Sequence, residues 1–347
     1  MRLLRSTLIA SSVLALALAG CTTSTPETPT TNPSTPAASP TASTDTSAPV
    51  DSGEVPKGNG ELVYLVSKGF QHRFWQAVKS GAEQAGAEYN YKIQFVGPDD
   101  ETKVTQQLDM LKSALDAKPL AIGFAALDTG AADPVLQQID AAGIPLVAFD
   151  SGVDSDQPIT TVQTNNVAAG AEAAKHMVEL VGGKGTVGVI CSDQTGQTAK
   201  ERCAGFMDYI KANAPDITIP EPQYAGEVGL AANTAKAMIQ ANPDIVGMYG
   251  TNEAAATGIV QGVTEAGKQG SITIVGFDSG KTQIEAIRDG RMAGAITQSP
   301  VTMGYETVVA AVKAANGIEL PKVIDSGFAW YDKTNIDDPE IAANLYE

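Results

Sequence analysis

The sequence is short of cysteine, histidine, aromatic residues and positive charge. Its 347 residues include three Cys and two His, and it contains no zinc-type spacing, P-loop, nucleophile elbow or His-centred triad. An enzyme is therefore the least favoured class, and we expect no catalytic residue, metal or cofactor. The 40 acidic residues outnumber 23 basic ones, which argues against nucleic acid or an anionic membrane as a binding partner.

Long apolar runs are also scarce, and the first one follows a short cationic start. The stretch from Leu8 to Ala19 is too short for a permanent transmembrane helix and is typical of a secretory signal. It runs into Leu-Ala-Gly-Cys, ending at Cys21, which resembles the bacterial lipobox, in which the Cys thiol takes a diacylglycerol. We therefore expect residues 1–21 to be a lipoprotein signal peptide and Cys21 to be the lipidation site. The alternative is an ordinary signal peptide in which Cys21 happens to follow small residues.

Residues 22–58 are built mainly from Thr, Ser, Pro and Ala. Such a composition offers nothing to bury, so we expect a disordered tether. A lipid anchor and a tether together predict a protein held at the extracytoplasmic face of the cell membrane.

The two cysteines that remain, Cys191 and Cys203, are close in sequence. In an oxidising compartment they can form a disulfide, and the alternative is two buried thiols. The sequence leaves both possibilities open.

From residue 61 onward, apolar runs of strand length alternate with helical stretches. The runs are rich in Val and Ile and nearly continuous in hydrophobicity, as expected when helices cover both faces of a parallel sheet. The predicted strands are Leu62–Ser67, Ile93–Val96, Leu120–Ala125, Pro145–Asp150, Ile159–Thr164, Thr186–Cys191, Ile245–Gly250, Ile272–Asp278 and Ala293–Gln298. This pattern predicts an α/β protein with two doubly wound parallel sheets.

Polar residues stand at the carboxyl ends of several predicted strands, where ligands bind in folds of this kind. The tetrapeptide Phe-Asp-Ser-Gly occurs twice, with its carboxylates at Asp150 and Asp278, which suggests two similar lobes. Carboxylates and amides bind hydroxyl groups, and aromatic rings cover the C–H faces of a sugar, so the set indicates a neutral polyol. A buried Asp needs a compensating donor, for which Arg202 is a candidate. Each Asp could instead cap the next helix.

Residues 183–188 match the G-x-G-x-x-G spacing of dinucleotide-binding proteins. They follow a predicted helix and precede a strand, whereas the dinucleotide motif follows a strand and opens a helix. We therefore reject a dinucleotide site and interpret Gly182 and Gly183 as the end of a helix.

These motifs, in this order, resemble those of the ribose- and galactose-type (type I) periplasmic sugar-binding proteins of ABC importers. The resemblance covers the chain from about residue 61 to its end. It rests on the segments His72–Gly81, Gly143–Asp150, Thr164–Gly170, Glu201–Phe206, Asn252–Glu253, Val275–Asp278 and Gln298–Pro300.

The resemblance implies a ligand-binding set drawn from both lobes, with aromatic residues stacking on the ligand from the first lobe. The implied residues are His72, Phe74, Trp75, Asp150, Ser151, Arg202, Asn252, Asp278 and Gln298. Two positions depart from the ribose-binding pattern, because Ser151 stands where ribose binders carry Arg and Ala125 stands where they carry Asn. Both departures favour a sugar other than ribose. Tyr224 is the nearest candidate for an aromatic residue from the second lobe.

The resemblance also implies two lobes joined by a three-strand hinge, with crossings near Thr164, Gln298 and Gly327. The expected lobes are 59–164 with 299–327, and 165–298 with 328–347. The expected partners of this monomer are a monosaccharide, an ABC permease and, through the lipid anchor, the membrane. The alternatives are a sensor that presents a sugar or furanosyl signal to a membrane receptor, and a sugar-responsive repressor. A repressor would need an N-terminal DNA-binding helix-turn-helix and a basic surface, which this sequence lacks.

Overall fold

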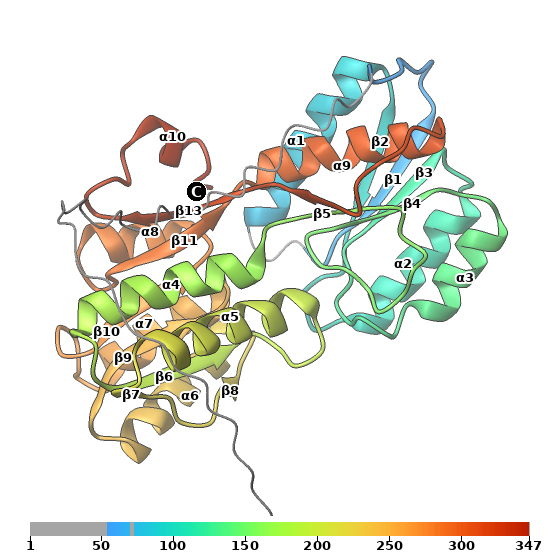
Figure 1. Cartoon of the computed structure of the whole chain (residues 1–347). Coiled ribbons are helices and arrows are strands. Elements are labelled where there is room, and N and C mark those ends of the chain that lie inside the picture. The colour runs from blue at the N-terminus through green and yellow to red at the C-terminus, as the bar shows by residue number, and fades with distance from the viewer. Residues whose placement is uncertain (1–53, 70–72, 347) are drawn as a thin grey trace, which may run out of the picture. The chain divides into compact units, whose positions relative to one another are not determined.

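The computed structural model describes residues 54–69 and 73–346 (Figure 1). The expected signal peptide with Cys21, most of the expected tether and His72 lie outside the described residues. Within the described residues, none of the helices has the length and apolar character needed to cross a membrane.

The first sheet has six parallel strands in the order β12-β5-β4-β3-β1-β2. Its strands are β1 (Leu62–Val66), β2 (Lys92–Val96), β3 (Ala121–Phe124), β4 (Leu146–Phe149), β5 (Thr161–Gln163) and β12 (Val323–Asp325). Helices α1 (Arg73–Tyr89) and α9 (Pro300–Ala315) cover one face, and α2 (Val104–Asp116) and α3 (Asp133–Ala141) cover the other (Figure 1). Helix α1 buries Phe74, Val78, Ala82 and Ala85 at helical spacing, which gives it one apolar face.

The second sheet has the order β13-β11-β10-β9-β6-β7, with β8 also paired to β6. Its strands are β6 (Gly185–Cys191), β7 (Ile217–Thr218), β8 (Gln223–Tyr224), β9 (Ile245–Gly250), β10 (Thr273–Phe277), β11 (Gly294–Gln298) and β13 (Phe328–Asp332). One face packs against α4 (Asn166–Val181) and α5 (Gln197–Asn213). The other packs against α6 (Val228–Ala241), α7 (Glu253–Glu265) and α8 (Lys281–Arg288). A short helix, α10 (Pro339–Ala342), follows β13.

All nine predicted strands are present, with ends within two residues of the predicted ones, and the doubly wound α/β fold is confirmed. Strands β7, β8, β12 and β13 were not predicted. The first three are two or three residues long, too short for a hydrophobic pattern to show. Strand β13 pairs antiparallel with β11, so this edge of the second sheet departs from the parallel pairing of the other strands.

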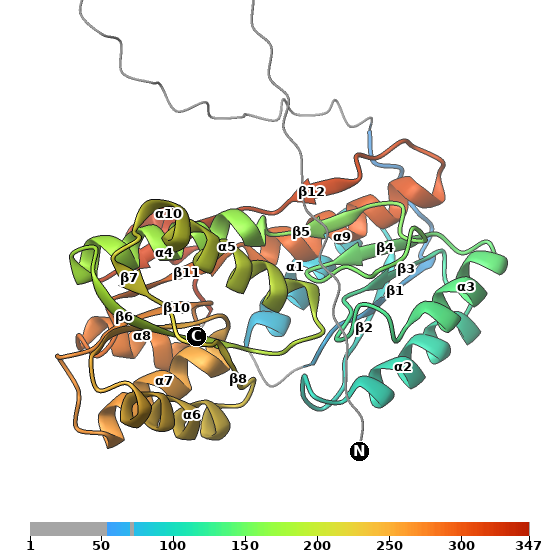
Figure 2. The ribbon, with the colours of Figure 1, turned by 60° about the horizontal axis from the view of Figure 1, so that its bottom comes forward.

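The chain passes between the two sheets three times. It crosses from β5 to α4, from β11 to α9 and from β12 to β13 (Figure 2). Polar side chains join these crossings: the Thr164 hydroxyl donates to Gln298 Oε1 at 3.0 Å and lies 3.5 Å from the Ser326 hydroxyl oxygen. These contacts tie the three crossings to one another.

In the second lobe Cys191, at the end of β6, and Cys203, on α5, form a disulfide with their Cα atoms 6.2 Å apart. On the same face of the sheet, the ring of Trp330 on β13 stacks on His176 of α4, with centroids 3.9 Å apart. The two contacts join α5 and α4 to the second sheet.

Candidate ligand-binding site

A cavity lies between the carboxyl ends of strands from both sheets. The cavity is lined by Lys68, Phe74, Trp75, Glu101, Asp150, Ser192, Thr198, Arg202, Asn252, Asp278 and Gln298.

In the first lobe, the polar centre of the cavity is an ion pair between Lys68 and Asp150. Lys68 follows β1 and Asp150 follows β4, and the Lys68 ammonium lies 3.1 Å from Asp150 Oδ2. The same ammonium donates to the Thr198 hydroxyl on α5 at 3.2 Å, so this pair also touches the second lobe.

Burial and neighbouring charges shift the pKa of each member of this pair in opposite directions. Burial raises the pKa of Asp150 above its ordinary value of 3.8, against the pull of Lys68 and Arg202. Burial alone would lower the pKa of Lys68, but the carboxylates of Asp150, Glu101 and Asp193 outweigh it and raise that pKa above 10.5. Lys68 therefore stays cationic and provides the buried carboxylate with its counter-charge.

Two aromatic side chains at the start of α1 form the apolar part of the lining. The rings of Phe74 and Trp75 meet edge to face with centroids 4.9 Å apart. The Trp75 indole nitrogen donates to Glu101 Oε1 at 2.8 Å, which fixes the orientation of the indole ring, and the Lys68 ammonium lies 5.9 Å from the ring centroid. Such rings can cover the C–H face of a sugar while the neighbouring polar groups bind its hydroxyls.

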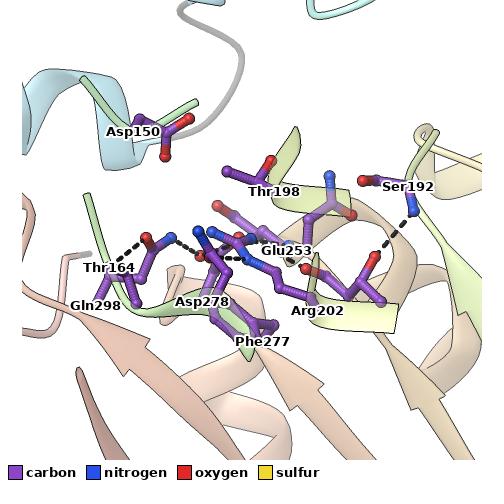
Figure 3. A network of polar contacts seen from close by, with 12 residues as sticks. Asp150, Thr164, Ser192, Thr198, Arg202, Glu253, Phe277, Asp278 and Gln298 are labelled. Atoms are coloured by element: carbon purple, nitrogen blue, oxygen red, sulfur yellow. Dashed lines mark hydrogen bonds and ion pairs between the residues drawn. The ribbon is translucent and has the colours of Figure 1, made fainter. Parts of the chain in front are cut away.

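In the second lobe, the corresponding carboxylate is Asp278, after β10. Gln298 Nε2 donates to Asp278 Oδ1 at 2.6 Å, and the backbone N–H of Glu253 donates to Oδ2 at 2.9 Å. Figure 3 shows Asp150 facing this cluster from the opposite side of the site. Because Gln298 also accepts from Thr164, a continuous chain of hydrogen bonds runs from the crossing at Thr164 to the Asp278 carboxylate.

Arg202 on α5 is held in place beside Asp278 by three contacts. Its Nε donates to Asn166 Oδ1 at 2.8 Å, its Nη1 donates to the Thr251 carbonyl at 3.0 Å, and its guanidinium lies over the Phe277 ring at 3.8 Å. Nη1 is 4.0 Å from Asp278 Oδ1. Arg202, which the sequence suggested as the donor for a buried Asp, thus lies near Asp278, whereas the direct partner of Asp150 is Lys68.

The two Phe-Asp-Ser-Gly segments adopt the same unusual backbone conformation. Asp150 has φ 57° and Asp278 has φ 76°, in the left-handed region that Asp tolerates better than most residues. Neither Asp caps a following helix: β4 is followed by a strand, and α8 has Gly280 as its N-cap. The helix-capping alternative was therefore wrong for both residues.

Three expectations need correction or qualification. Ser151 is fully buried and is absent from the residues that line the cavity. Tyr224 is 45% exposed and does not line the cavity either, because β8 lies off the main path of the second sheet. Asn252 lines the cavity, but its side-chain oxygen caps α7 by accepting from the Ala255 N–H at 2.9 Å, which leaves its amide nitrogen for a ligand.

Sequence reasoning missed four lining residues: Lys68, Glu101, Ser192 and Thr198. Ser192 follows β6 directly, Lys68 lies two residues after the end of β1, and Glu101 lies in the loop after β2. Thr198 stands one helical turn before Arg202 on α5. Applying the strand-end rule to every strand would have found Lys68 and Ser192.

The position of Arg202 depends on a close crossing of α4 and α5. A Cβ atom on Gly170 would lie 2.4 Å from the Arg202 carbonyl oxygen, and one on Gly205 would lie 2.2 Å from the Val167 carbonyl oxygen. The glycines therefore allow the two helices to approach closely enough for Arg202 to reach Asn166 and Thr251.

We expect Gly170→Ala to lower the free energy of unfolding by about 1–3 kcal/mol, because the added methyl group overpacks this crossing. Urea unfolding measures the change. The matched control is Gly229→Ala on α6, where an added Cβ meets open space, and we expect it to stay within about 0.5 kcal/mol of the wild type. Equal stabilities for the two variants would contradict this interpretation.

The charged residues of the lining comprise two cations, Lys68 and Arg202, and three carboxylates, Asp150, Asp278 and Glu101. Among the described residues there is no group of three or more His, Cys, Asp and Glu side chains that could hold a metal ion. The arrangement suits an uncharged ligand with several hydroxyls, because carboxylates accept from hydroxyls while ammonium, guanidinium and amide groups donate to them.

Comparison with known proteins decides the family. Residues 63–319 match the periplasmic binding protein domain. The chain belongs to the periplasmic binding protein family. This binding protein is 24% identical to the ribose import binding protein of Bacillus subtilis over 255 residues, which are 73% of this chain and 81% of the relative.

Solved structures agree with this assignment. An ABC transporter solute-binding protein from Agrobacterium vitis with bound D-fucose is 32% identical, with a TM-score of 0.78 over 83% of this chain and 100% of the other. A second one from the same organism, bound to α-D-tagatopyranose, is 29% identical, with a TM-score of 0.79 over 83% of this chain and 99% of the other. The predicted family is therefore confirmed, as is the expectation that this chain is a transport-type binding protein and not an enzyme.

Proposed function

We propose that this binding protein captures a monosaccharide between its two lobes and delivers it to an ABC import permease while Cys21 anchors it to the outside of the cell membrane. The observation that carries the proposal is the composition of the cavity. One wall is the aromatic pair Phe74 and Trp75, and each lobe contributes one buried carboxylate, Asp150 or Asp278, with a cation close by.

A monosaccharide fits this lining better than a charged or apolar ligand does. Every lining charge already has an opposite charge nearby, so an ionic ligand would leave a buried charge uncompensated. A ring bearing several hydroxyls can instead join the existing hydrogen-bond network on both sides. A sugar that lacks one of these hydroxyls would leave a buried polar group of the protein unpaired, which makes such a site selective.

The relatives support a monosaccharide without favouring one. The sugars given in their names or bound in their structures are ribose, D-fucose and α-D-tagatopyranose. These sugars differ in carbon number and in hydroxyl pattern. In the first lobe of this chain Lys68 pairs with Asp150, and Ser151 is not among the residues that line the cavity. This lining supports a sugar other than ribose.

The test is a thermal-shift screen of the full chain against pentoses, hexoses, deoxyhexoses, inositols and nucleosides. At about 100 times the dissociation constant, a ligand should add roughly 2.7 kcal/mol of stability, which is a readily measured shift. Isothermal titration of the best ligand then gives the affinity. The proposal fails if no sugar shifts the transition, or if only nucleosides or charged ligands do.

A further inference from the structure

The peptide group between Asp278 and Ser279 is held on both sides by tyrosine hydroxyls. The Tyr331 hydroxyl donates to the Asp278 carbonyl at 2.8 Å, and the Ser279 N–H donates to the Tyr346 hydroxyl oxygen at 3.1 Å. Asp278 has a positive φ, and a residue in that region keeps its conformation only when its surroundings impose it. The two hydroxyls supply that constraint next to the ligand-binding carboxylate.

The segment that carries Tyr346 is fastened to the second lobe just before this residue. The Asn344 carbonyl accepts from the Thr297 hydroxyl at 2.9 Å and from the Ser279 hydroxyl at 3.3 Å. Leu345 packs against the core cluster of the second lobe. The segment is thus tied to the ends of β10 and β11, the two strands that present Asp278 and Gln298.

The ring of Tyr346 belongs to the other lobe's core. It is 6% exposed and is part of the buried cluster that contains Val78 and Met303 of the first lobe. Its centroid lies 5.9 Å from that of Phe74, with an interplanar angle of 67°. Phe74 in turn meets Trp75 edge to face, so the ring supports the aromatic wall of the cavity from behind.

We propose that Tyr346 is a positioning residue that couples the Asp278 turn of one lobe to the aromatic wall of the other. Its hydroxyl fixes the backbone that presents Asp278, and its ring packs on Phe74 when the lobes are closed. Ligand binding and lobe closure then share this contact, so each favours the other. This inference rests on the proposed function of the cavity.

The two roles predict different effects for two substitutions. Tyr346→Phe keeps the ring but leaves the buried Ser279 N–H without its acceptor, so we expect sugar affinity to fall about tenfold with closure retained. Tyr346→Ala also removes the contact with Phe74, so we expect a larger loss of affinity together with weaker closure. Tyr331→Phe should resemble Tyr346→Phe, because it removes the other hydroxyl from the same peptide group.

Closure is measured separately from affinity through the backbone N–H of Gly152, which donates to Gln197 Oε1 across the cleft at 2.5 Å. Hydrogen–deuterium exchange of the full chain at Gly152, with and without sugar, reports this contact. We expect faster exchange in Tyr346→Ala and unchanged exchange in Tyr346→Phe at saturating sugar. The matched control is Tyr91→Phe, whose hydroxyl donates to the Pro56 carbonyl in the first lobe; it should alter neither quantity.

Wild-type affinity in both Tyr346→Phe and Tyr346→Ala would overturn the proposal. If the wild type itself binds no sugar, the proposed function fails, and exchange at Gly152 in the sugar-free protein still decides the coupling. Equal exchange in Tyr346→Ala and Tyr91→Phe would then reject the link between the lobes.

Discussion

Asp278→Asn is expected to weaken sugar binding about 100-fold while leaving the fold intact. The carboxylate accepts from Gln298 and from the Glu253 N–H, and Arg202 lies 4.0 Å away. Replacing it removes a charged acceptor for the sugar, and hydrogen bonds to charged groups contribute about 1.5–3 kcal/mol each. A loss of about 2.7 kcal/mol corresponds to a 100-fold change in affinity.

Asparagine is the informative replacement, because Asp278 has φ 76° and Asn tolerates the left-handed region better than Ala. Isothermal titration with the best sugar gives the affinity, and thermal unfolding without sugar tests the fold. Asp109→Asn is the control, because this side chain is 68% exposed on α2. Wild-type affinity in Asp278→Asn would remove Asp278 from the binding site.

Lys68→Met is expected to destabilise the protein by about 3–5 kcal/mol near neutral pH. The substitution keeps a long unbranched side chain but leaves the Asp150 carboxylate, 3% exposed, without its counter-ion. Removing one partner of a buried ion pair typically costs this much. Lys112→Met is the matched control, because Lys112 and its partner Asp109 are both exposed. Such surface ion pairs contribute about 0–1 kcal/mol to stability.

The loss in Lys68→Met should diminish as the pH falls. Burial already raises the pKa of Asp150, and loss of Lys68 raises it further. Between the unfolded pKa and this raised folded pKa, the folded state binds more protons, so stability decreases as pH rises and recovers as pH falls. Urea unfolding over a pH series measures this trend.

The double variant Lys68→Met/Asp150→Asn supplies the second test of this pair. Without an uncompensated carboxylate, most of the lost stability should return at neutral pH, and the pH trend should disappear. A double variant no more stable than Lys68→Met would show that the ion pair is not the cause.

The central strands could be predicted because each is a buried run of Val, Ile and neighbouring apolar residues, and such runs carry a strong local signal. The edge strands could not. Strand β12 is three residues long with an exposed Val323, and β13 owes its antiparallel pairing to the path of the chain through the third crossing. Such features depend on distant partners and leave no periodic pattern in the local sequence.

The two carboxylates of the candidate site were predictable because Asp150 and Asp278 each end a predicted strand. What the sequence did not reveal is which charges pair. Arg202 was a candidate donor for a buried Asp, but only the three-dimensional packing places it over Phe277 and brings Lys68 to Asp150. Tyr346 was also missed, because nothing in the local sequence links a tyrosine near residue 346 to a turn near residue 278.

The two tryptophans lie in different surroundings, and this difference affects the intrinsic fluorescence of the protein. The sequence contains two tryptophans: Trp75 lines the cavity, whereas Trp330 stacks on His176 outside it. A sugar that covers the Trp75 ring changes the polarity around one emitter and leaves the other as an internal reference. We therefore expect the intrinsic fluorescence of this protein to report occupancy of the candidate site without any added dye, and we expect Trp75→Phe to silence that report while the Trp330 signal persists.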